Sequence, residues 1–496
     1  RSHGRPPEPA MTWEEILGAL APGQSRMSSS PYDSAWVARL NESQLTEPAR
    51  EWLVAHQLPD GGWGASWPVW YPDRFASTLA AVVAMAETGD PASDHVLRAS
   101  QALSEYGERI GQGDYTRWPI GFEMIVPTLA EQLRSVPGLE KVPALNGTWM
   151  STMNYARFRK LQALRAVGGV ISRDVTLAFS AEMAGDDHHL LSIDSLQSAN
   201  GSVDYSPSAT AYFAGITGAR SALDYLSGIV HDDGGAPVVA PSDVFEVGWV
   251  LWNLSLLRDV DDGLLTQCQP LLDWLQGLWN PIGVPQAEGY TPTDSDDTAL
   301  TYTVLSRLGR TVDIEPILRF EEKTHFRCFS LEADPSISAN IHVLEALVTG
   351  GYTKKNASVW KVLEFLRGRQ HRGFWRDKWH LSPYYATAHA LIAYSGQFDD
   401  EWLRAMSWLM ATQRDDGGWG FFGRSTAEET AYALQALTIW QRQSGVVPPD
   451  MIQRGAGWLG EHGDPPYPPL WIGKGLYCPE LVVQSAVLSA LALAAE

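Results

Sequence analysis

Residues 57–64 read Gln-Leu-Pro-Asp-Gly-Gly-Trp-Gly, and residues 413–420 read Gln-Arg-Asp-Asp-Gly-Gly-Trp-Gly. Both have the form Q-x-x-D-G-G-W-G, although they lie in distant parts of the chain. Weaker copies start at Gln197, with Asn-Gly in the turn, and at Gln370, where one residue is missing. Asp-Gly and Asn-Gly favour turns because these residues tolerate positive φ. Each repeat therefore predicts a clamp at a helix end, with the Trp packed over that end and the Gln bound to free backbone groups.

The segments between these turns carry apolar residues at three- and four-residue intervals, which is typical of amphipathic helices. They are residues 77–87, 176–184, 244–257, 298–308, 337–347, 358–367, 387–394, 426–441 and 481–494. Strand-like alternation is scarce. Helix pairs joined by Gly-rich turns indicate a closed ring of helices, an α/α toroid. The sequence therefore predicts an all-α protein, and the wide separation of the two strong repeats favours two toroids.

The boundary between the toroids is expected in the Gly- and Pro-rich stretch 232–241. We assign residues 30–238 to the first toroid, and residues 11–29 together with 239–496 to the second. Residues 1–10 are polar and contain proline, so we interpret them as a tag or disordered leader and not as a signal peptide.

The composition excludes several classes of protein. With 37 Lys and Arg against 58 Asp and Glu, the net charge of −21 opposes nucleic-acid binding. Cys268, Cys328 and Cys478 lie far apart with no C-x-x-C pair, which argues against a disulfide framework and a Cys-rich zinc site. No window approaches the roughly 18 consecutive apolar residues of a transmembrane segment. We therefore expect a cytoplasmic protein with no nucleic-acid partner and no transmembrane segment.

Three carboxylates stand within four residues at Asp294, Asp296 and Asp297, directly before an apolar helical segment. Carboxylates this close repel one another, so at least one is expected to have a raised pKa and to hold a proton at neutral pH. In a dry pocket that proton could be given to a base as weak as an alkene. Alternatively, Asp294 could cap the helix while the helix dipole favours the other two. The spacing leaves both interpretations open.

The stretch from Asp294 to Asp297 resembles the D-x-D-D motif of class II terpene cyclases, and the repeats resemble the QW motifs of that superfamily. Further similar stretches occur at residues 30–38, 73–79, 119–123, 206–210, 375–380, 384–385 and 465–478. Together they are similar to bacterial class II diterpene cyclases, close to the halimadienyl, terpentedienyl and copalyl diphosphate synthases. The resemblance implies a βγ architecture, in which the first toroid is γ-like and the second, β-like toroid carries the D-x-D-D motif.

The resemblance also implies a reaction. Asp296 would protonate the terminal alkene of a linear prenyl diphosphate, Asp294 and Asp297 would tune this acid, and His342 would contact it. Geranylgeranyl diphosphate would cyclise to a bicyclic product that retains its diphosphate, which makes the enzyme an isomerase of the intramolecular lyase type. Farnesyl diphosphate, giving a drimane-type diphosphate, is the alternative substrate. No D-D-x-x-D stretch occurs, so class I ionisation of the diphosphate is not predicted.

Carbocations need surroundings that stabilise positive charge without attacking it, and aromatic faces do so by roughly 0.5–2 kcal/mol each. The chain is rich in Trp, with 21 against 14 Phe. The candidates for contact with the substrate are Trp249, Trp252, Trp375, Trp379, Tyr384 and Tyr385, for each of which core packing is the alternative.

The sequence says less about how the diphosphate is bound and how the reaction terminates. Lys160 matches a family lysine that meets the diphosphate, with a solvated surface lysine as the alternative. The family's acidic motif is reduced here to Asp114, which the resemblance implies as the remaining Mg²⁺ ligand. Plant enzymes that make the ent-copalyl product carry a His/Asn pair for the final deprotonation, and Phe179 and Val238 stand at those positions. Neither can accept a proton, so termination is expected to use another base or a water position.

Two other classes of function stay open at this point. A toroidal glycoside hydrolase would need two acids about 5–10 Å apart across a sugar-binding cleft, whereas these acids are contiguous. In a non-catalytic toroid scaffold, the acid cluster would have no role other than capping a helix. For a cyclase the partners would be the prenyl diphosphate and a separate class I synthase or phosphatase acting on the product, and a homodimer is compatible with the sequence.

Overall fold

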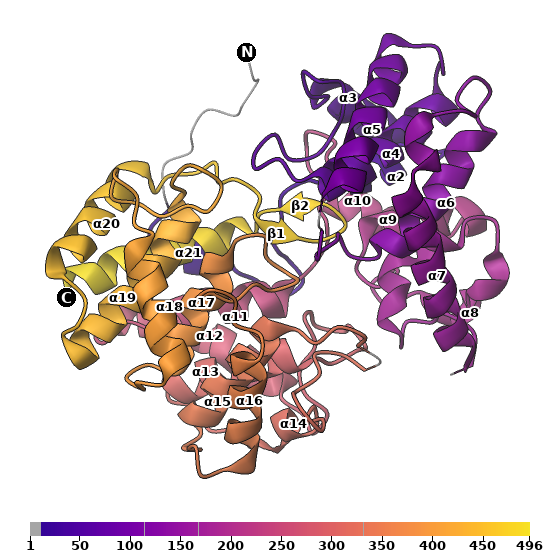
Figure 1. Cartoon of the computed structure of the whole chain (residues 1–496). Helices are drawn as coiled ribbons and strands as arrows, with labels where there is room; N and C mark the ends of the chain where they lie inside the picture. The colour runs from indigo at the N-terminus through magenta and orange to yellow at the C-terminus, as the bar shows by residue number, and fades with distance from the viewer. Residues whose placement is uncertain (1–10, 114, 167, 331) are drawn as a thin grey trace.

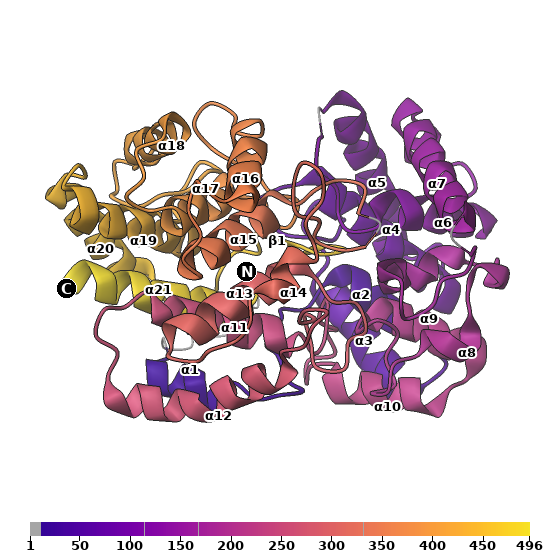
Figure 2. The same cartoon turned by 90° about the horizontal axis from the view of Figure 1, so that it is seen from below.

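The computed structural model describes residues 11–113, 115–166, 168–330 and 332–496, so the assigned leader, residues 1–10, lies outside the described residues. Two helical lobes lie side by side in both views (Figures 1 and 2). The strands named in the described part are β1 (Trp471–Ile472) and β2 (Leu476–Tyr477), which form a hairpin. Within the described residues, no helix is both long enough and apolar enough to cross a membrane.

The first lobe is a closed ring of inner elements, each in contact with the next and the last in contact with the first. In order they are α2 (Pro31–Val37), α4 (Tyr71–Thr88), α6 (Phe122–Ser135), the 3₁₀ helix η2 (Thr176–Ala184) and α9 (Pro207–Thr217). The outer elements are α3 (Ser43–Ala55), α5 (Asp94–Gln112), α7 (Thr148–Ala166) and α10 (Arg220–Ile229), with the short η1 (Pro143–Asn146), η3 (His188–Leu190) and α8 (Ile193–Leu196) between them. One hydrophobic core, drawn from residues 32–236, fills this ring.

The second lobe is a ring of six inner helices in the described part of the chain, and it also closes on itself. They are α11 (Asp243–Ser255), α13 (Ser295–Arg307), α15 (Ile337–Thr349), α17 (Pro383–Ala393), α19 (Ala427–Ser444) and α21 (Glu480–Ala495). Their outer partners are, in the same order, α12 (Asp262–Leu278), α14 (Glu315–Leu318), α16 (Ala357–Arg367), α18 (Asp400–Ala411), α20 (Pro449–His462) and α1 (Trp13–Ala19). The predicted all-α fold of two toroids is confirmed.

The N-terminal helix α1 belongs to the second ring, although the whole first lobe follows it in sequence. Ile16, Leu17 and Leu20 are buried in the core that residues 244–490 build. The described part of the chain therefore begins in the second lobe, passes through the first, and returns to the second.

Residues 176–184 differ from the expected amphipathic α-helix. They form the 3₁₀ helix η2, which is interrupted at Ser180, where φ is −116° and ψ is 35°. Neighbouring helices satisfy the backbone here, because the Thr128 hydroxyl donates to Met183 O at 2.6 Å and Arg157 Nη2 donates to it at 3.0 Å. Side chains of α6 and α7 thus satisfy a carbonyl at the end of η2.

The strong repeats act as the predicted helix-end clamps. Gln413 Nε2 donates to Gly417 O at 2.8 Å, within its own turn, and to Met451 O at 2.9 Å, at the start of α20. Trp419 Nε1 donates to Leu409 O at 2.8 Å, near the end of α18. One repeat thereby joins the end of one outer helix to the beginning of the next, which confirms the clamp inferred from the sequence.

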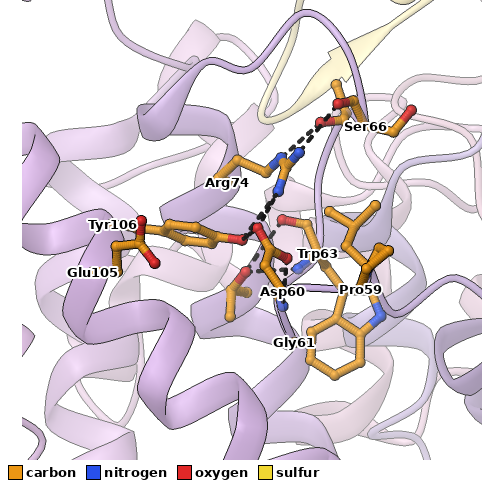
Figure 3. Close-up of polar contacts among 12 residues, drawn as sticks. Pro59, Asp60, Gly61, Trp63, Ser66, Arg74, Glu105 and Tyr106 are labelled. Carbon is orange, nitrogen blue, oxygen red and sulfur yellow. Dashed lines mark hydrogen bonds and ion pairs between the residues drawn. The ribbon is translucent and has the colours of Figure 1, made fainter.

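The repeat at residues 57–64 makes the same bonds and adds a charged network (Figure 3). The Asp60 carboxylate accepts from Arg74 Nη1 at 2.9 Å and from the Tyr106 hydroxyl at 2.6 Å. Trp63 Nε1 donates to Leu53 O at 2.8 Å. This network attaches the turn to inner helix α4 and outer helix α5.

A further turn of this kind occurs in the stretch expected as a boundary. Gly235 N donates to Asp233 Oδ1 at 3.0 Å and His231 N donates to Gly235 O at 2.9 Å, as the equivalent backbone groups do in the strong repeats. Gly234 has φ of 90°, and a Cβ there would lie 2.3 Å from Pro48 O. Sequence reasoning missed this turn because the stretch keeps Asp-Gly-Gly but lacks the Gln and the Trp.

The β1–β2 hairpin lies between the lobes in Figure 1 and joins them by hydrogen bonds. Its tip residue Lys474 is buried, and its ammonium donates to Glu182 Oε1 at 2.6 Å, to Ser206 Oγ at 2.8 Å and to Ser208 Oγ at 2.7 Å. The three acceptors belong to the first lobe, whereas the hairpin belongs to the second. We call this group the Lys474 junction.

Replacing Trp419 by Phe tests the clamp. The variant leaves Leu409 O buried without its donor, so we expect the free energy of unfolding to fall by about 1–3 kcal/mol. Trp360→Phe is the matched control, because Trp360 is 48% exposed on outer helix α16. Urea-induced unfolding measures both variants, and equal losses of stability would contradict a structural role for the indole hydrogen bond.

Candidate active site

A cavity of about 900 Å³ lies between the two lobes, and both contribute to its wall. The first lobe supplies residues around η2 and α7, including Phe179 and Lys160. The second lobe supplies all three aspartates of the acid cluster and several aromatic side chains. The cavity therefore joins the acid cluster to an aromatic wall.

The start of helix α13 positions the acid cluster. Asp294 is the N-cap, and its Oδ1 accepts from Asp297 N at 2.7 Å. Asp294 and Asp297 are buried, whereas the Asp296 side chain keeps 20% of its surface exposed. The capping interpretation thus holds for Asp294, and the cap leaves the Asp296 carboxyl in the first turn, at the cavity wall.

The surroundings of the cluster favour protonated carboxyls. Burial raises the pKa of Asp294 to about 7, and the charge of Asp296 adds to this effect. Burial and the charges of Asp294 and Asp296 raise the pKa of Asp297 well above its ordinary value. The expectation that at least one of these carboxyls has a raised pKa is confirmed for Asp294 and Asp297.

His342 meets the acid from the neighbouring helix of the ring, α15. Its Nδ1 lies in hydrogen-bond contact with Asp296 Oδ1, and its Nε2 has no partner among the described residues. Burial lowers the pKa of His342, but the Asp296 charge and hydrogen bond outweigh it and raise the pKa above the ordinary value. With a proton on Nδ1, the imidazole donates to Oδ1 of Asp296 and leaves the other carboxyl oxygen, Oδ2, outside this bond.

Two of the six predicted aromatic contacts line the cavity. Trp379 and Tyr385 stand in the wall, and the His380 ring stacks on Tyr385 with centroids 4.7 Å apart. The sequence did not identify seven other aromatic residues of the wall as substrate contacts, namely Phe179, Phe245, Tyr290, Phe320, Phe329, Trp471 and Tyr477. Trp471 and Tyr477 lie in the family-like stretch 465–478, which is the signal that pointed to them.

The other four predicted aromatics are not among the described residues of the wall. Trp249 lies behind it, stacked on His389 with centroids 4.9 Å apart, and Trp252 Nε1 donates to Glu345 Oε2 at 2.9 Å. Trp375 Nε1 donates to Leu366 O at 2.8 Å, as the clamp tryptophans do, and Tyr384 packs on an outer-helix Trp. For these four residues core packing, the alternative interpretation, describes their position.

The polar groups implied for the diphosphate and the metal are only partly described. Lys160 lines the cavity and forms an ion pair with Glu123, at the start of α6. Asp114, the predicted metal ligand, lies outside the described residues. Across the described ranges, no three His, Cys, Asp or Glu side chains gather where they could hold a metal.

Comparison with known proteins places this site in a family. The squalene-hopene cyclase C-terminal domain family matches residues 327–464. A type B diterpene cyclase of Mycobacterium tuberculosis is 43% identical over 504 residues, which cover 98% of this chain and 99% of that protein. The chain belongs to the class II diterpene cyclase family.

Other relatives agree along the length of the cyclase. Terpentedienyl-diphosphate synthase of Kitasatospora griseola is 30% identical over 496 residues, covering 94% of the cyclase and 96% of that enzyme. The solved structure of ent-copalyl diphosphate synthase from Streptomyces platensis matches with a TM-score of 0.79 at 28% identity, covering 98% and 99% of the two chains. The resemblance drawn from the motifs is confirmed, and family membership decides against the glycoside hydrolase and the scaffold.

Replacing Asp294 by Asn tests the electrostatics of the cluster. The pKa rises from 3.8 in the unfolded chain to about 7 in the folded cyclase, so between these pH values only the folded state holds this proton. The stability of the wild type therefore falls as pH rises through this range. Asn keeps the cap and does not titrate, so the variant should gain up to about 1.4 kcal/mol per pH unit over the wild type.

Urea unfolding at about pH 5 and about pH 8 measures this difference. Asp261→Asn is the matched control, because Asp261 caps α12 from an exposed position and its Oδ1 accepts from Gly263 N at 2.8 Å. A pH dependence equal to that of the control would refute the raised pKa of Asp294.

Proposed function

We propose that the cyclase protonates the terminal alkene of geranylgeranyl diphosphate and converts it into a bicyclic product that retains its diphosphate. This reaction makes it an isomerase of the intramolecular lyase type. The observation that carries the proposal is the acid cluster, with its raised carboxyl pKa values, at the wall of an aromatic-lined cavity. The names of the similar diphosphate synthases support the same substrate class.

The proposed chemistry begins at Asp296. The proton on Oδ2 moves to the terminal alkene, whose π electrons form the new C–H bond and leave a tertiary cation. His342 holds the other oxygen and orients the acid, while its buried neighbours Asp294 and Asp297 have raised pKa values and so add less negative charge beside it. Successive alkenes attack the cation, and loss of a proton ends the reaction without breaking the diphosphate bond.

The wall suits this sequence of cations. Trp379, Tyr385 and Trp471 offer aromatic faces, each of which stabilises a cation by roughly 0.5–2 kcal/mol. The cavity of about 900 Å³ lies toward the large end of ligand pockets, roughly 300–1,000 Å³, which favours the C20 substrate over farnesyl diphosphate.

The remaining roles are proposed from the chemistry of the product and substrate. Lys160 would meet the diphosphate, and Mg²⁺ would accompany it, since Mg²⁺ commonly binds substrate phosphates with one or two carboxylates. A product that keeps its diphosphate needs a separate class I synthase or phosphatase to consume it. A cytoplasmic location and a homodimer remain predictions from the sequence.

One assay tests the proposed function. The purified cyclase is incubated with geranylgeranyl diphosphate and Mg²⁺, and the dephosphorylated products are analysed by mass spectrometry for a bicyclic alcohol. Asp296→Asn should lower turnover by roughly 10²–10⁴-fold, because the acid that starts the reaction is lost. Asp261→Asn should retain wild-type turnover, since this exposed cap lies outside the cavity wall. No product from any C15 or C20 prenyl diphosphate would disprove the proposal, and an active Asp296→Asn would remove Asp296 as the acid.

Competition between the C15 and C20 substrates tests chain length. With both diphosphates present at equal concentration, we expect the C20 product to dominate, because a longer apolar chain buries more surface in a cavity of this size. The ratio of the two kcat/KM values, obtained from the product ratio, is the measurement. A ratio that favours farnesyl diphosphate would assign the cyclase to drimane chemistry.

A further inference from the structure

The cavity wall contains one tyrosine whose hydroxyl is bonded to a buried carboxylate. Tyr290, four residues before the acid cluster, donates its hydroxyl proton to Asp204 Oδ2 at 3.0 Å. Tyr290 belongs to the second lobe and lines the cavity, whereas Asp204 stands just before α9 in the first lobe. The pair therefore reaches across the junction of the lobes.

Apolar side chains pack against Tyr290. Phe179 and Val238, the positions that lack a proton acceptor, pack in one hydrophobic cluster with Tyr290 and also line the cavity. Neither of these two side chains can accept a proton beside Tyr290. Tyr290, which packs beside Phe179 and Val238, carries a hydroxyl group that these two side chains lack.

Asp204 is held in an unusual backbone conformation. Its φ is 51°, in the left-handed region that non-glycine residues seldom adopt, and the next residue, Tyr205, has φ of 60°. Such conformations persist where the surrounding structure enforces them, and they concentrate at functional sites. Here the turn directs the carboxylate towards the Tyr290 hydroxyl.

The Asp204 carboxyl is also a strong base when ionised. Burial raises its pKa well above the ordinary value, while the Tyr290 hydrogen bond and the charge of Lys474 act in the opposite direction. Lys474, whose ammonium is paired with Glu182, favours the ionised Asp204 carboxyl through its charge, against the effect of burial.

We infer that Tyr290 and Asp204 together accept the proton whose loss ends the cyclisation. The electrons of the broken C–H bond form the product alkene, the proton passes to Tyr290 Oη, and the tyrosine's own proton moves to Asp204 Oδ2. A cation and a carboxylate thus become a neutral alkene and a neutral carboxylic acid. The inference rests on the proposed function and assigns its terminating base.

Tyr290→Phe is the deciding variant, because it removes only the hydroxyl. Initiation at Asp296 is unaffected, so geranylgeranyl diphosphate should still be consumed. Deprotonation at the wild-type position should slow by roughly 10²–10⁴-fold, the usual contribution of a general base. The wild-type product should therefore give way to other alkene isomers or to hydroxylated products, measured as product fractions by mass spectrometry after dephosphorylation. Asp204→Asn should change the products in the same way.

Tyr205→Phe is the matched control. Tyr205 packs on Tyr290 with ring centroids 5.4 Å apart, but its hydroxyl donates to a backbone carbonyl, Glu288 O, at 2.7 Å. Wild-type products from this variant, together with altered products from the other two, would support the pair as the base. Unchanged product fractions in Tyr290→Phe would overturn the inference, and so would loss of all substrate consumption in both Tyr290→Phe and Asp204→Asn.

The same experiment separates failure of this inference from failure of the proposed function. A wild-type cyclase that consumes no prenyl diphosphate refutes the proposed function, and the inference falls with it. An active wild type with identical products from all variants refutes the inference alone.

Discussion

The indole hydrogen bond at a helix end is the interaction on which the architecture depends. Each strong repeat presents Trp Nε1 to a carbonyl near the end of one outer helix and Gln Nε2 to the start of the next. Helices held in this way can succeed one another around a ring without long connections. The rings in turn place α13 beside α15, and that contact brings Asp296 and His342 together.

Much of the fold and the cap of the acid cluster could be predicted from the sequence, because the residues that determine them lie close together in the chain. The repeats specify their own turns, and the acid cluster specifies its own cap through the bond from Asp297 N to Asp294 Oδ1. The turn at residues 231–235 was not predicted because it lacks the Gln and the Trp by which the repeat is recognised. At the end of η2, Met183 O accepts from side chains of α6 and α7, and no pattern within residues 176–184 can reveal these contacts.

The aromatic wall was harder to predict for a geometric reason. Inner helices such as α11 are buried on every side, so a helical period does not tell which face reaches the cavity. Phe245 lines the cavity, whereas Trp249, one turn later, lies behind the wall against His389. The contact between Tyr290 and Asp204 joins residues 86 positions apart on different lobes. No pattern in the sequence around either residue predicts that the two meet.

The Lys474 junction limits which lobes can be combined in one protein. Lys474 comes from the second lobe, while Glu182, Ser206 and Ser208 come from the first, and all four are buried. Pairing either lobe with one that lacks the matching group would bury an uncompensated charge. The toroids are therefore not interchangeable parts. A lobe can be exchanged without loss of the junction only if the hairpin residue Lys474 and its acceptors in the other lobe stay matched.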